Sequence, residues 1–232
     1  MKNGMKVICH MAITIDGKIL TGNWAKESWA DKFSGLFEKY HQTFDSEAWI
    51  LGRVSMEKDF SNGAKPQPVQ PTHPIDRKAF IGNPDATSFA IAVDKSGKLG
   101  WNANNIDGDH IIELLSEDVS DAYLNYLQQK EISYVFAGTS TLDFKIALEQ
   151  LQTHFPIRTL MLEGGGHLNG SFLNAGLIDE LSVLLLPIAD GTPKTTTLFE
   201  VSEELFKAPA SQLTLQKVEQ LDDSVLWLRY EV

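Results

Sequence analysis

The sequence contains a single cysteine, Cys9, among its 232 residues. One cysteine cannot form an intramolecular disulfide, so the sequence suits a reducing compartment and predicts a cytoplasmic protein. Because Cys9 lies within an apolar run, we interpret it as a small core side chain and not as a nucleophile.

Positive charge is also scarce. The chain has 20 Lys and Arg residues against 31 Asp and Glu residues, which gives a net charge of −11. Nucleic acids and anionic membranes both bind to basic surfaces, so this balance argues against either as a partner. It leaves room for a local basic pocket that binds a phosphorylated small molecule.

Long apolar runs and metal-binding motifs are missing as well. No apolar run reaches the roughly 18–20 residues that a membrane-spanning helix needs, and the N-terminus lacks a signal-peptide pattern. Zinc spacings, a Walker motif and internal repeats are absent, so we predict no metal ion. The hydrophobic content of 43% suffices for a substantial core, and we expect one domain over residues 1–232.

Short apolar runs alternate with helical patterns along most of the chain. Runs typical of buried strands cover residues 5–13, 48–51, 88–93, 110–115, 132–136 and 159–162. Helical spacing covers residues 27–44, 120–129, 142–151 and 168–177. Further strand patterns follow at 181–187, 212–220 and 224–232 without long helices between them. We therefore predict an α/β fold with a mixed, mainly parallel sheet, helices on both faces and a C-terminal antiparallel hairpin.

A proline-rich segment interrupts this alternation. Residues 61–87 contain five prolines among polar residues and fit no regular element, so they predict a long surface loop.

Three consecutive glycines mark the most informative stretch, Glu163-Gly164-Gly165-Gly166, between a predicted strand and a predicted helix. Glycine lets the backbone approach a ligand closely, and the free N–H groups of a helix N-terminus attract anions. An ordinary tight turn is the alternative. Three glycines behind a carboxylate favour a phosphate site over that alternative.

Other predicted strands also end in glycine or polar residues. Carboxyl ends of strands in open α/β sheets form the usual ligand edge. Arg53 and Lys95 suit the 2′-phosphate of NADPH, since guanidinium and ammonium groups bind phosphate well. The glycine run is not the usual dinucleotide fingerprint, because Asn169 stands where its third glycine would be. The junctions are Asp16-Gly17, Gly52-Arg53-Val54-Ser55, Asp94-Lys95, Gly138-Thr139 and Glu163-Gly164.

One histidine, His10, interrupts the first apolar run. It is either a core histidine with satisfied hydrogen bonds or a side chain that points into a pocket at the end of the strand. The sequence leaves both interpretations open.

Four segments resemble a known family. They are Met11-Ala-Ile-Thr-Ile-Asp-Gly17, Ile50-Leu-Gly-Arg-Val-Ser55, Tyr134-Val-Phe-Ala-Gly138 and the long stretch Glu163–Leu181. Together they resemble the pyrimidine reductases of riboflavin biosynthesis, which occur as the reductase domain of the bacterial deaminase/reductase and as stand-alone proteins. The resemblance covers roughly residues 7–187 and implies a dihydrofolate reductase-like fold, often as a homodimer.

The resemblance also implies chemistry. The family transfers a hydride from NADPH to C1′ of the ribosylamino group of a phosphorylated aminopyrimidine. Thr14, Asp16 and Glu163 would face the substrate, with Asp16 and Glu163 as the catalytic candidates and Asp59 as a weaker substrate contact. A cis peptide between Gly164 and Gly165 is also expected. NADPH would lie across Gly52, Arg53, Gly138, Thr139, Gly164, Gly165, Gly166, His167 and Leu168, with Gly17, Ser55, Asp94 and Lys95 on the same edge.

Two positions depart from the family pattern. Many members carry lysine where this chain has His10, and serine where it has Thr14. Three hypotheses therefore stay open: a riboflavin-pathway reductase, a reductase of the same fold with a dihydropterin or another carbonyl or imine substrate, and a non-catalytic nucleotide-binding relative. Turn capping is the alternative role for Asp16, and a plain surface position is the alternative for Asp59.

Overall fold

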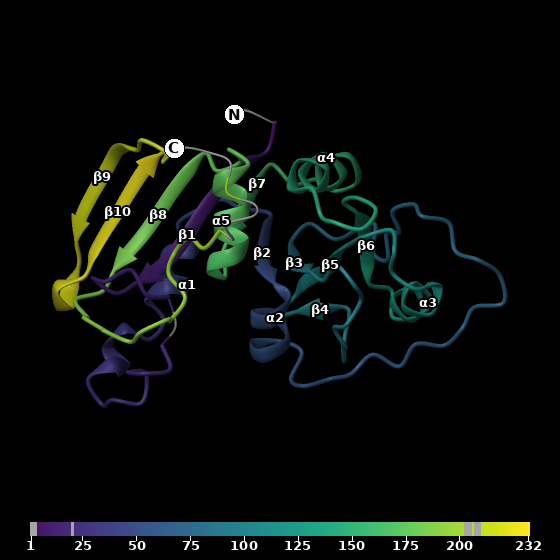
Figure 1. Cartoon of the computed structure of the whole chain (residues 1–232), viewed down its shortest axis with the longest axis horizontal. Helices are drawn as coiled ribbons and strands as arrows, with labels where there is room; N and C mark the ends of the chain where they lie inside the picture. The colour runs from purple at the N-terminus through teal and green to yellow at the C-terminus, as the bar shows by residue number, and fades with distance from the viewer. Residues whose placement is uncertain (1–3, 20, 202–205, 207–209) are drawn as a thin grey trace. The chain divides into compact units, whose positions relative to one another are not determined.

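The chain folds into two compact units that are discontinuous in sequence (Figure 1). The computed structural model describes residues 4–19, 21–201, 206 and 210–232. Of these, the first unit comprises Lys6–Asp45 and Met161–Val232, and the second comprises Ser46–Leu160 with Gly4 and Met5. A single domain over residues 1–232 stays a prediction.

The first unit is built on four strands. The parallel pair is β1 (Lys6–Ile13) with β8 (Glu180–Leu185). Next to β8 lies the antiparallel hairpin of β10 (Leu226–Glu231) and β9 (Thr214–Gln220), closed by a short 3-10 turn, η2 (Asp222–Ser224). This confirms the predicted C-terminal hairpin.

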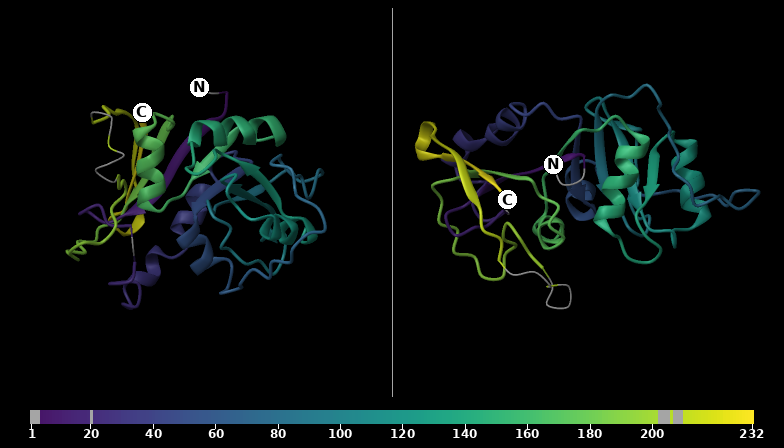
Figure 2. Two further views of the ribbon diagram at one scale, coloured as in Figure 1. Left: turned by 45° about the vertical axis from the view of Figure 1, so that its right-hand side comes forward. Right: turned by 90° about the horizontal axis from the view of Figure 1, so that it is seen from above.

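Helices lie on both faces of these strands (Figure 2). One face carries the 3-10 turn η1 (Ala30–Phe33) and α1 (Leu36–His41), and the other carries α5 (Gly166–Asn174). The prediction of one helix over residues 27–44 is wrong, because Gly35 adopts a left-handed conformation (φ 73°) that separates η1 from α1.

The second unit contains parallel strands in the order β2 (Ala48–Gly52), β3 (Phe89–Val93), β5 (Asp109–Leu115) and β6 (Ser133–Phe136). A two-residue strand that the sequence did not indicate, β4 (Asn105–Ile106), pairs antiparallel with the start of β5. Along the chain, β7 (Thr159–Leu162) leads from the second unit back into the first. The mixed, mainly parallel α/β fold is confirmed.

Three helices belong to the second unit. The sequence did not indicate α2 (Arg53–Asp59), which begins directly at the end of β2. The side chains of Ser120 and Asp143 cap α3 (Asp121–Gln129) and α4 (Phe144–His154) by accepting backbone N–H bonds. Residues 61–87, all of them described, contain no helix or strand and confirm the predicted long loop.

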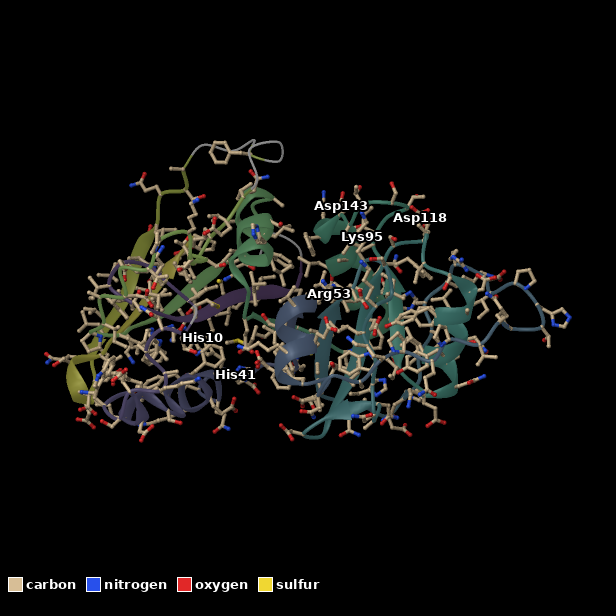
Figure 3. The ribbon with its side chains drawn as sticks, turned by 60° about the horizontal axis from the view of Figure 1, so that its bottom comes forward. His10, His41, Arg53, Lys95, Asp118 and Asp143 are labelled. Carbon is tan, nitrogen blue, oxygen red and sulfur yellow. The ribbon has the colours of Figure 1, made fainter. Side chains whose placement is uncertain are left out.

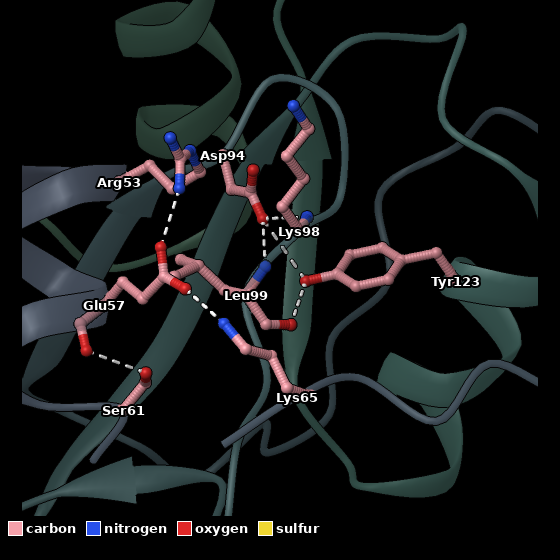
Figure 4. Close-up of polar contacts among 8 residues, drawn as sticks. All are labelled: Arg53, Glu57, Ser61, Lys65, Asp94, Lys98, Leu99 and Tyr123. Atoms are coloured by element: carbon pink, nitrogen blue, oxygen red, sulfur yellow. Dashed lines mark hydrogen bonds and ion pairs between the residues drawn. The ribbon is translucent and has the colours of Figure 1, made fainter. Parts of the chain in front are cut away.

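A buried acidic side chain, Glu113, lies at the centre of the second unit. Its Oε1 is 2.5 Å from the indole nitrogen of Trp101 and 2.8 Å from the hydroxyl of Tyr123. That hydroxyl is also 2.8 Å from the carbonyl oxygen of Leu99 (Figure 4). One hydroxyl proton cannot serve both oxygens, so a protonated Glu113 is needed to complete the pair.

The electrostatic environment of Glu113 also favours its protonated form. Burial, together with the nearby charge of Asp94, raises the pKa of Glu113 well above its usual range. Glu113 is therefore a neutral acid that donates a hydrogen bond at the core of the second unit.

This assignment predicts a pH-dependent stability difference between the wild type and Glu113→Gln. Above the unfolded pKa of about 4.5, the unfolded chain has lost the proton that the folded chain keeps. Wild-type stability should fall relative to the variant by about 1.4 kcal/mol per pH unit until the folded pKa is reached. Urea unfolding between pH 5 and 8 measures this, with exposed Glu149→Gln as the control. A difference that does not change with pH would contradict a protonated Glu113.

Candidate functional site

A glycine turn joins β7 to α5 in the first unit. Gly165 is the N-cap of α5, and no side chain caps the helix there. The peptide between Gly164 and Gly165 is cis, which confirms the expectation from the sequence. Gly164 has φ +101°, and a Cβ on Gly166 would lie 2.3 Å from the carbonyl oxygen of Thr197, so neither position accepts a side chain easily.

This turn presents backbone donors. The first N–H groups of any helix have no intrahelical acceptor, which applies here to Gly166 and His167. The amide of Leu168, in contrast, donates to the carbonyl oxygen of Gly165 at 2.9 Å. His167 is exposed and Leu168 is buried. A phosphate group at this bare helix start stays a prediction.

The carboxylate in front of the glycines has a partner that the sequence did not indicate. Oε1 of Glu163 lies 2.5 Å from Nδ1 of His41, the last residue of α1. The two side chains are 9% and 18% exposed, so the pair is largely shielded from solvent. A carboxylate and an imidazole at this distance form a charge-assisted hydrogen bond.

The other histidine, His10, is fully buried in β1. Its Nε2 lies 3.1 Å from the carbonyl oxygen of Phe37, and its Nδ1 lies 2.9 Å from the hydroxyl of Ser182. The indole N–H of Trp227 donates to the same hydroxyl at 2.9 Å. Since the carbonyl can only accept, Nε2 carries the proton and Nδ1 accepts from Ser182.

This arrangement makes His10 a satisfied core histidine. Burial lowers its pKa to about 4, which outweighs the opposing effect of the hydrogen bond to Phe37. Both ring nitrogens are occupied within the protein, so the structure favours the core interpretation over a direct substrate contact. Local hydrogen bonds to Ser182 and Phe37 thus hold the histidine at position 10, where many family members carry lysine.

Thr14 and Asp16 shape the turn after β1. The buried Thr14 hydroxyl donates to Asp16 at 2.7 Å and accepts from the amide of Lys18 at 3.0 Å. The Asp16 carboxylate also accepts the amides of Asp190 and Gly191 at 3.1 and 2.9 Å. The hydrogen bond from Thr14 leads these effects in lowering the pKa of Asp16, so the side chain is ionised. Asp16 therefore caps the turn and holds the segment after β8.

Gly17 occupies the left-handed position of the same turn, with φ +78°. Its carbonyl oxygen accepts the amide of Leu198 at 3.1 Å. The positive φ explains why a glycine stands at position 17. The hydrogen bond from Leu198 connects this turn to the segment around residue 198.

A cavity of about 420 Å³ opens beside the glycine turn in the first unit. Met11 and Ile19 line it, and they are also the side chains nearest to the positions that a Cβ on Gly164 or Gly165 would take. Trp24, Phe33 and Phe37 supply aromatic walls. Such an apolar pocket with a few polar groups suits a flat organic ring.

The second unit brings three of the predicted junctions to one edge. Gly52-Arg53, Asp94-Lys95 and Gly138-Thr139 follow β2, β3 and β6, whose parallel pairing puts their carboxyl ends together. Figure 3 labels Arg53, Lys95, Asp118 and Asp143 on this unit.

Arg53 is already engaged on this edge (Figure 4). Its guanidinium donates to Glu57 one helical turn later at 2.8 Å, and Lys65 donates to the other oxygen of Glu57 at 2.7 Å. Two cations thus share one carboxylate, and the buried carboxyl group of Asp94 also interacts electrostatically with Arg53.

Asp94 has a structural role at the same edge. It is buried, and one of its oxygens accepts the amides of Lys98 and Leu99 at 2.5 and 2.6 Å, which closes the turn that presents Lys95. Its other oxygen is buried without a hydrogen-bond partner. Desolvation by burial raises the pKa of Asp94. Asp94 therefore stabilises the turn after β3, and its predicted cofactor contact stays a prediction.

The remaining predicted residues of this unit are Thr139, Ser55 and Asp59. The exposed Thr139 reaches Glu117 only at 3.4 Å. Ser55 is half-buried on α2, and Asp59 is exposed at the end of that helix, 3.7 Å from Lys58. Asp59 thus matches its alternative role as a surface residue.

The described residues contain no helix long and apolar enough to cross a membrane. Among the same residues, no group of three or more His, Cys, Asp or Glu side chains is arranged to hold a metal ion.

Comparison with known proteins adds an independent finding. A family model described as the RibD C-terminal domain matches residues 5–227. The chain is 25% identical over 222 residues to the 2,5-diamino-6-ribosylamino-4(3H)-pyrimidinone 5′-phosphate reductase of Methanothermobacter thermautotrophicus, covering 95% of each protein.

Solved structures share the fold. A pyrimidine reductase-like protein from Corynebacterium diphtheriae aligns with a TM-score of 0.69 and 16% identity over 100% of this chain and 93% of that one. A riboflavin biosynthesis reductase from Saccharomyces cerevisiae aligns with a TM-score of 0.62 and 13% identity, over 98% of this chain and 89% of that one.

The neutral state of His10 can be measured directly. Because burial holds its pKa at about 4, its imidazole resonances should stay constant in NMR spectra between pH 8 and 5. The unfolded chain takes up a proton near pH 6.5 while the folded chain does not, so stability should decrease as pH falls from 6.5 towards 4. His10→Asn identifies the resonances. A chemical-shift transition of His10 centred above pH 6 would contradict the assignment.

Proposed function

We propose that this chain, which belongs to the RibD C-terminal domain family, is a pyrimidine reductase of riboflavin biosynthesis. It reduces the ribosylamino group of a phosphorylated aminopyrimidine to a ribitylamino group. The observation that carries the proposal is the family match over residues 5–227, with a pyrimidine reductase aligned over 95% of its own length.

The proposed cofactor is NADPH. When bound, it supplies a hydride for C1′ of the sugar. In the first unit we assign phosphate contacts to the backbone of Gly164–Leu168, whose glycine turn and uncapped helix start fit an anion. In the second unit we assign contacts to Arg53, Lys95 and the Gly138-Thr139 backbone, since these groups follow β2, β3 and β6 at the carboxyl ends of parallel strands.

The substrate residues follow from the first unit. Glu163 stands directly before the glycine turn and is paired with His41. Asp16 is ionised, so it can accept hydrogen bonds from sugar hydroxyls but cannot supply a proton. The cavity beside Met11 and Ile19 fits the pyrimidine ring, because its aromatic walls favour a flat group.

One observation favours a second candidate substrate. The cavity is lined mainly by apolar side chains, and no lysine stands at position 10 to meet a substrate phosphate. A reductase of the same fold that acts on a different imine or carbonyl, without a phosphate, is the alternative. The homodimer and the cytoplasmic location stay predictions.

The proposed reaction is tested by mixing purified protein, NADPH and 2,5-diamino-6-ribosylamino-4(3H)-pyrimidinone 5′-phosphate. Absorbance at the reduced nicotinamide band should fall, and mass spectrometry should find a product two hydrogens heavier. The dephosphorylated analogue is the control for the second candidate. Turnover of that analogue at an equal or higher rate would favour the alternative, and no turnover of either would refute the riboflavin assignment.

Arg53 gives a separate prediction on cofactor choice. Arg53→Ala should weaken NADPH binding by roughly tenfold to hundredfold, since a charge-assisted hydrogen bond contributes about 1.5–3 kcal/mol. NADH binding should stay within about twofold, because NADH lacks the 2′-phosphate. Glu57→Gln should tighten NADPH binding severalfold by removing the competing carboxylate from Arg53.

Fluorescence titration with both nucleotides measures these affinities. Lys58→Ala is the matched control, because it removes a cation from the same helix at an exposed position. Equal losses for NADPH and NADH in Arg53→Ala would exclude Arg53 as the 2′-phosphate ligand.

A further inference from the structure

The substrate that we propose carries a phosphate, yet position 10 holds a histidine whose two ring nitrogens are both bonded within the protein. Phosphate groups are bound most strongly by cationic donors. We propose that Lys18 binds the substrate phosphate at the cavity that we assign to the pyrimidine. This inference rests on the proposed function and names the side chain that recognises the phosphate.

Lys18 brings a positive charge to this cavity. It is half-buried, and it lines the cavity together with Met11, Ile19 and Phe37. The other charged side chain of the described lining is Asp31, which is exposed, so water and salt screen its charge. A lysine in such a position typically packs its apolar stem along the wall and keeps its ammonium group free to meet an anion.

The ammonium group of Lys18 has hydrogen-bond donors to spare. Its Nζ donates to the carbonyl oxygen of Thr195 at 3.2 Å, and this acceptor carries no charge. Among the described residues, no carboxylate forms an ion pair with Nζ. An ammonium group has three N–H donors, so the bond to Thr195 leaves the others for phosphate oxygens.

Backbone contacts on two sides fix the position of Lys18. Its amide donates to the hydroxyl of Thr14 at 3.0 Å, and its carbonyl oxygen accepts the amide of Thr14 at 3.0 Å. On the other side, Lys18 forms an antiparallel β-bridge with Thr197, and the amide of Ile19 donates to the carbonyl oxygen of Thr196 at 3.2 Å. None of these contacts uses the Lys18 side chain, so a substitution there leaves them in place.

Glu200 is a carboxylate that interacts electrostatically with Lys18. Its Oε1 accepts both the amide and the hydroxyl of Thr197 at 2.8 Å. These hydrogen bonds are the main cause of the lowered pKa of Glu200, and the charges of His167 and Lys18 contribute less. Glu200 is therefore held by Thr197, and its charge offsets that of Lys18 only in part.

A cofactor phosphate is the other possible source of the same chemistry. Lys18 is next to Ile19, whose Cδ1 lies 4.0 Å from the position that a Cβ on Gly165 would take, so the glycine turn is close. The cavity favours the substrate, because Lys18 lines it together with aromatic side chains that suit a flat ring. We therefore assign Lys18 to the substrate phosphate, and measurements on both ligands separate the two sources.

The decisive variant is Lys18→Met, which keeps most of the side-chain length and removes the charge. The wild type should have a lower KM for the phosphorylated pyrimidine than for its dephosphorylated analogue. Lys18→Met should shrink this KM ratio by about tenfold to hundredfold, because it removes a charge-assisted hydrogen bond. Lys18→Arg keeps a cation and should retain most of the ratio. The Kd of NADPH should stay within about twofold in Lys18→Met.

Two further variants control for general effects of charge. Lys26→Met removes an exposed cation of the same unit that does not line the cavity, and it should leave the KM ratio unchanged. Glu200→Gln keeps an oxygen for Thr197 but removes a negative charge near Lys18, so the ratio should increase severalfold.

Several results would overturn the role of Lys18. They are an unchanged KM ratio in Lys18→Met, a weaker NADPH affinity with an unchanged ratio, and a wild type that does not favour the phosphorylated pyrimidine. An active wild type with any of these results defeats only the role of Lys18.

A binding measurement tests Lys18 without turnover. Ribose 5-phosphate carries the sugar and the phosphate of the proposed substrate, and calorimetric titration should show tighter binding to the wild type than to Lys18→Met, by about tenfold or more. If the wild type reduces neither pyrimidine, the proposed function fails and this titration decides on Lys18. Equal binding by the two proteins, or no binding by the wild type, would then refute the phosphate site.

Discussion

A chain of hydrogen bonds through His10 organises the first unit. The indole of Trp227 on β10 donates to Ser182 on β8, Ser182 donates to His10 on β1, and His10 donates to Phe37 on α1. The terminal carbonyl can only accept, so Nε2 of His10 carries a proton, and burial keeps the ring neutral so that Nδ1 accepts from Ser182. Neutral His10 is therefore the link through which hydrogen bonds connect β1, β8 and β10 to α1.

This constraint sets the chemistry of the histidine in the first strand. A buried imidazole that must stay neutral cannot deliver a proton near neutral pH, since its pKa is about 4. His41, on the helix that His10 secures, meets a carboxylate instead of a hydroxyl and a carbonyl. The two histidines thus differ in their hydrogen-bond partners: a hydroxyl and a carbonyl for His10, a carboxylate for His41.

The sequence was informative wherever a local pattern determined the structure. Apolar runs located the long strands, and the glycines after Glu163 located the helix start, whereas the cis peptide was expected from the family resemblance. The break at Gly35 was missed because periodicity does not report a positive φ. The pairing of His41 with Glu163 was missed for another reason, since it joins residues 122 positions apart and no spacing encodes such a contact.

Asp94 shows that a sequence can locate a junction without specifying what the side chain contacts. The polar junction after β3 was visible in the sequence, but the hydrogen bonds of the carboxylate to the amides of Lys98 and Leu99 were not.

Buried polar groups also reconcile the acidity of the chain with an anionic ligand. A net charge of −11 describes the whole surface, whereas a phosphate responds to charges within about 10 Å at ordinary ionic strength. In the second unit, two cations share Glu57, and Glu113 stays uncharged within the core. Arg53 and Lys95 at the strand ends of an acidic protein can therefore still attract a phosphate, because charges much farther away than this distance are screened.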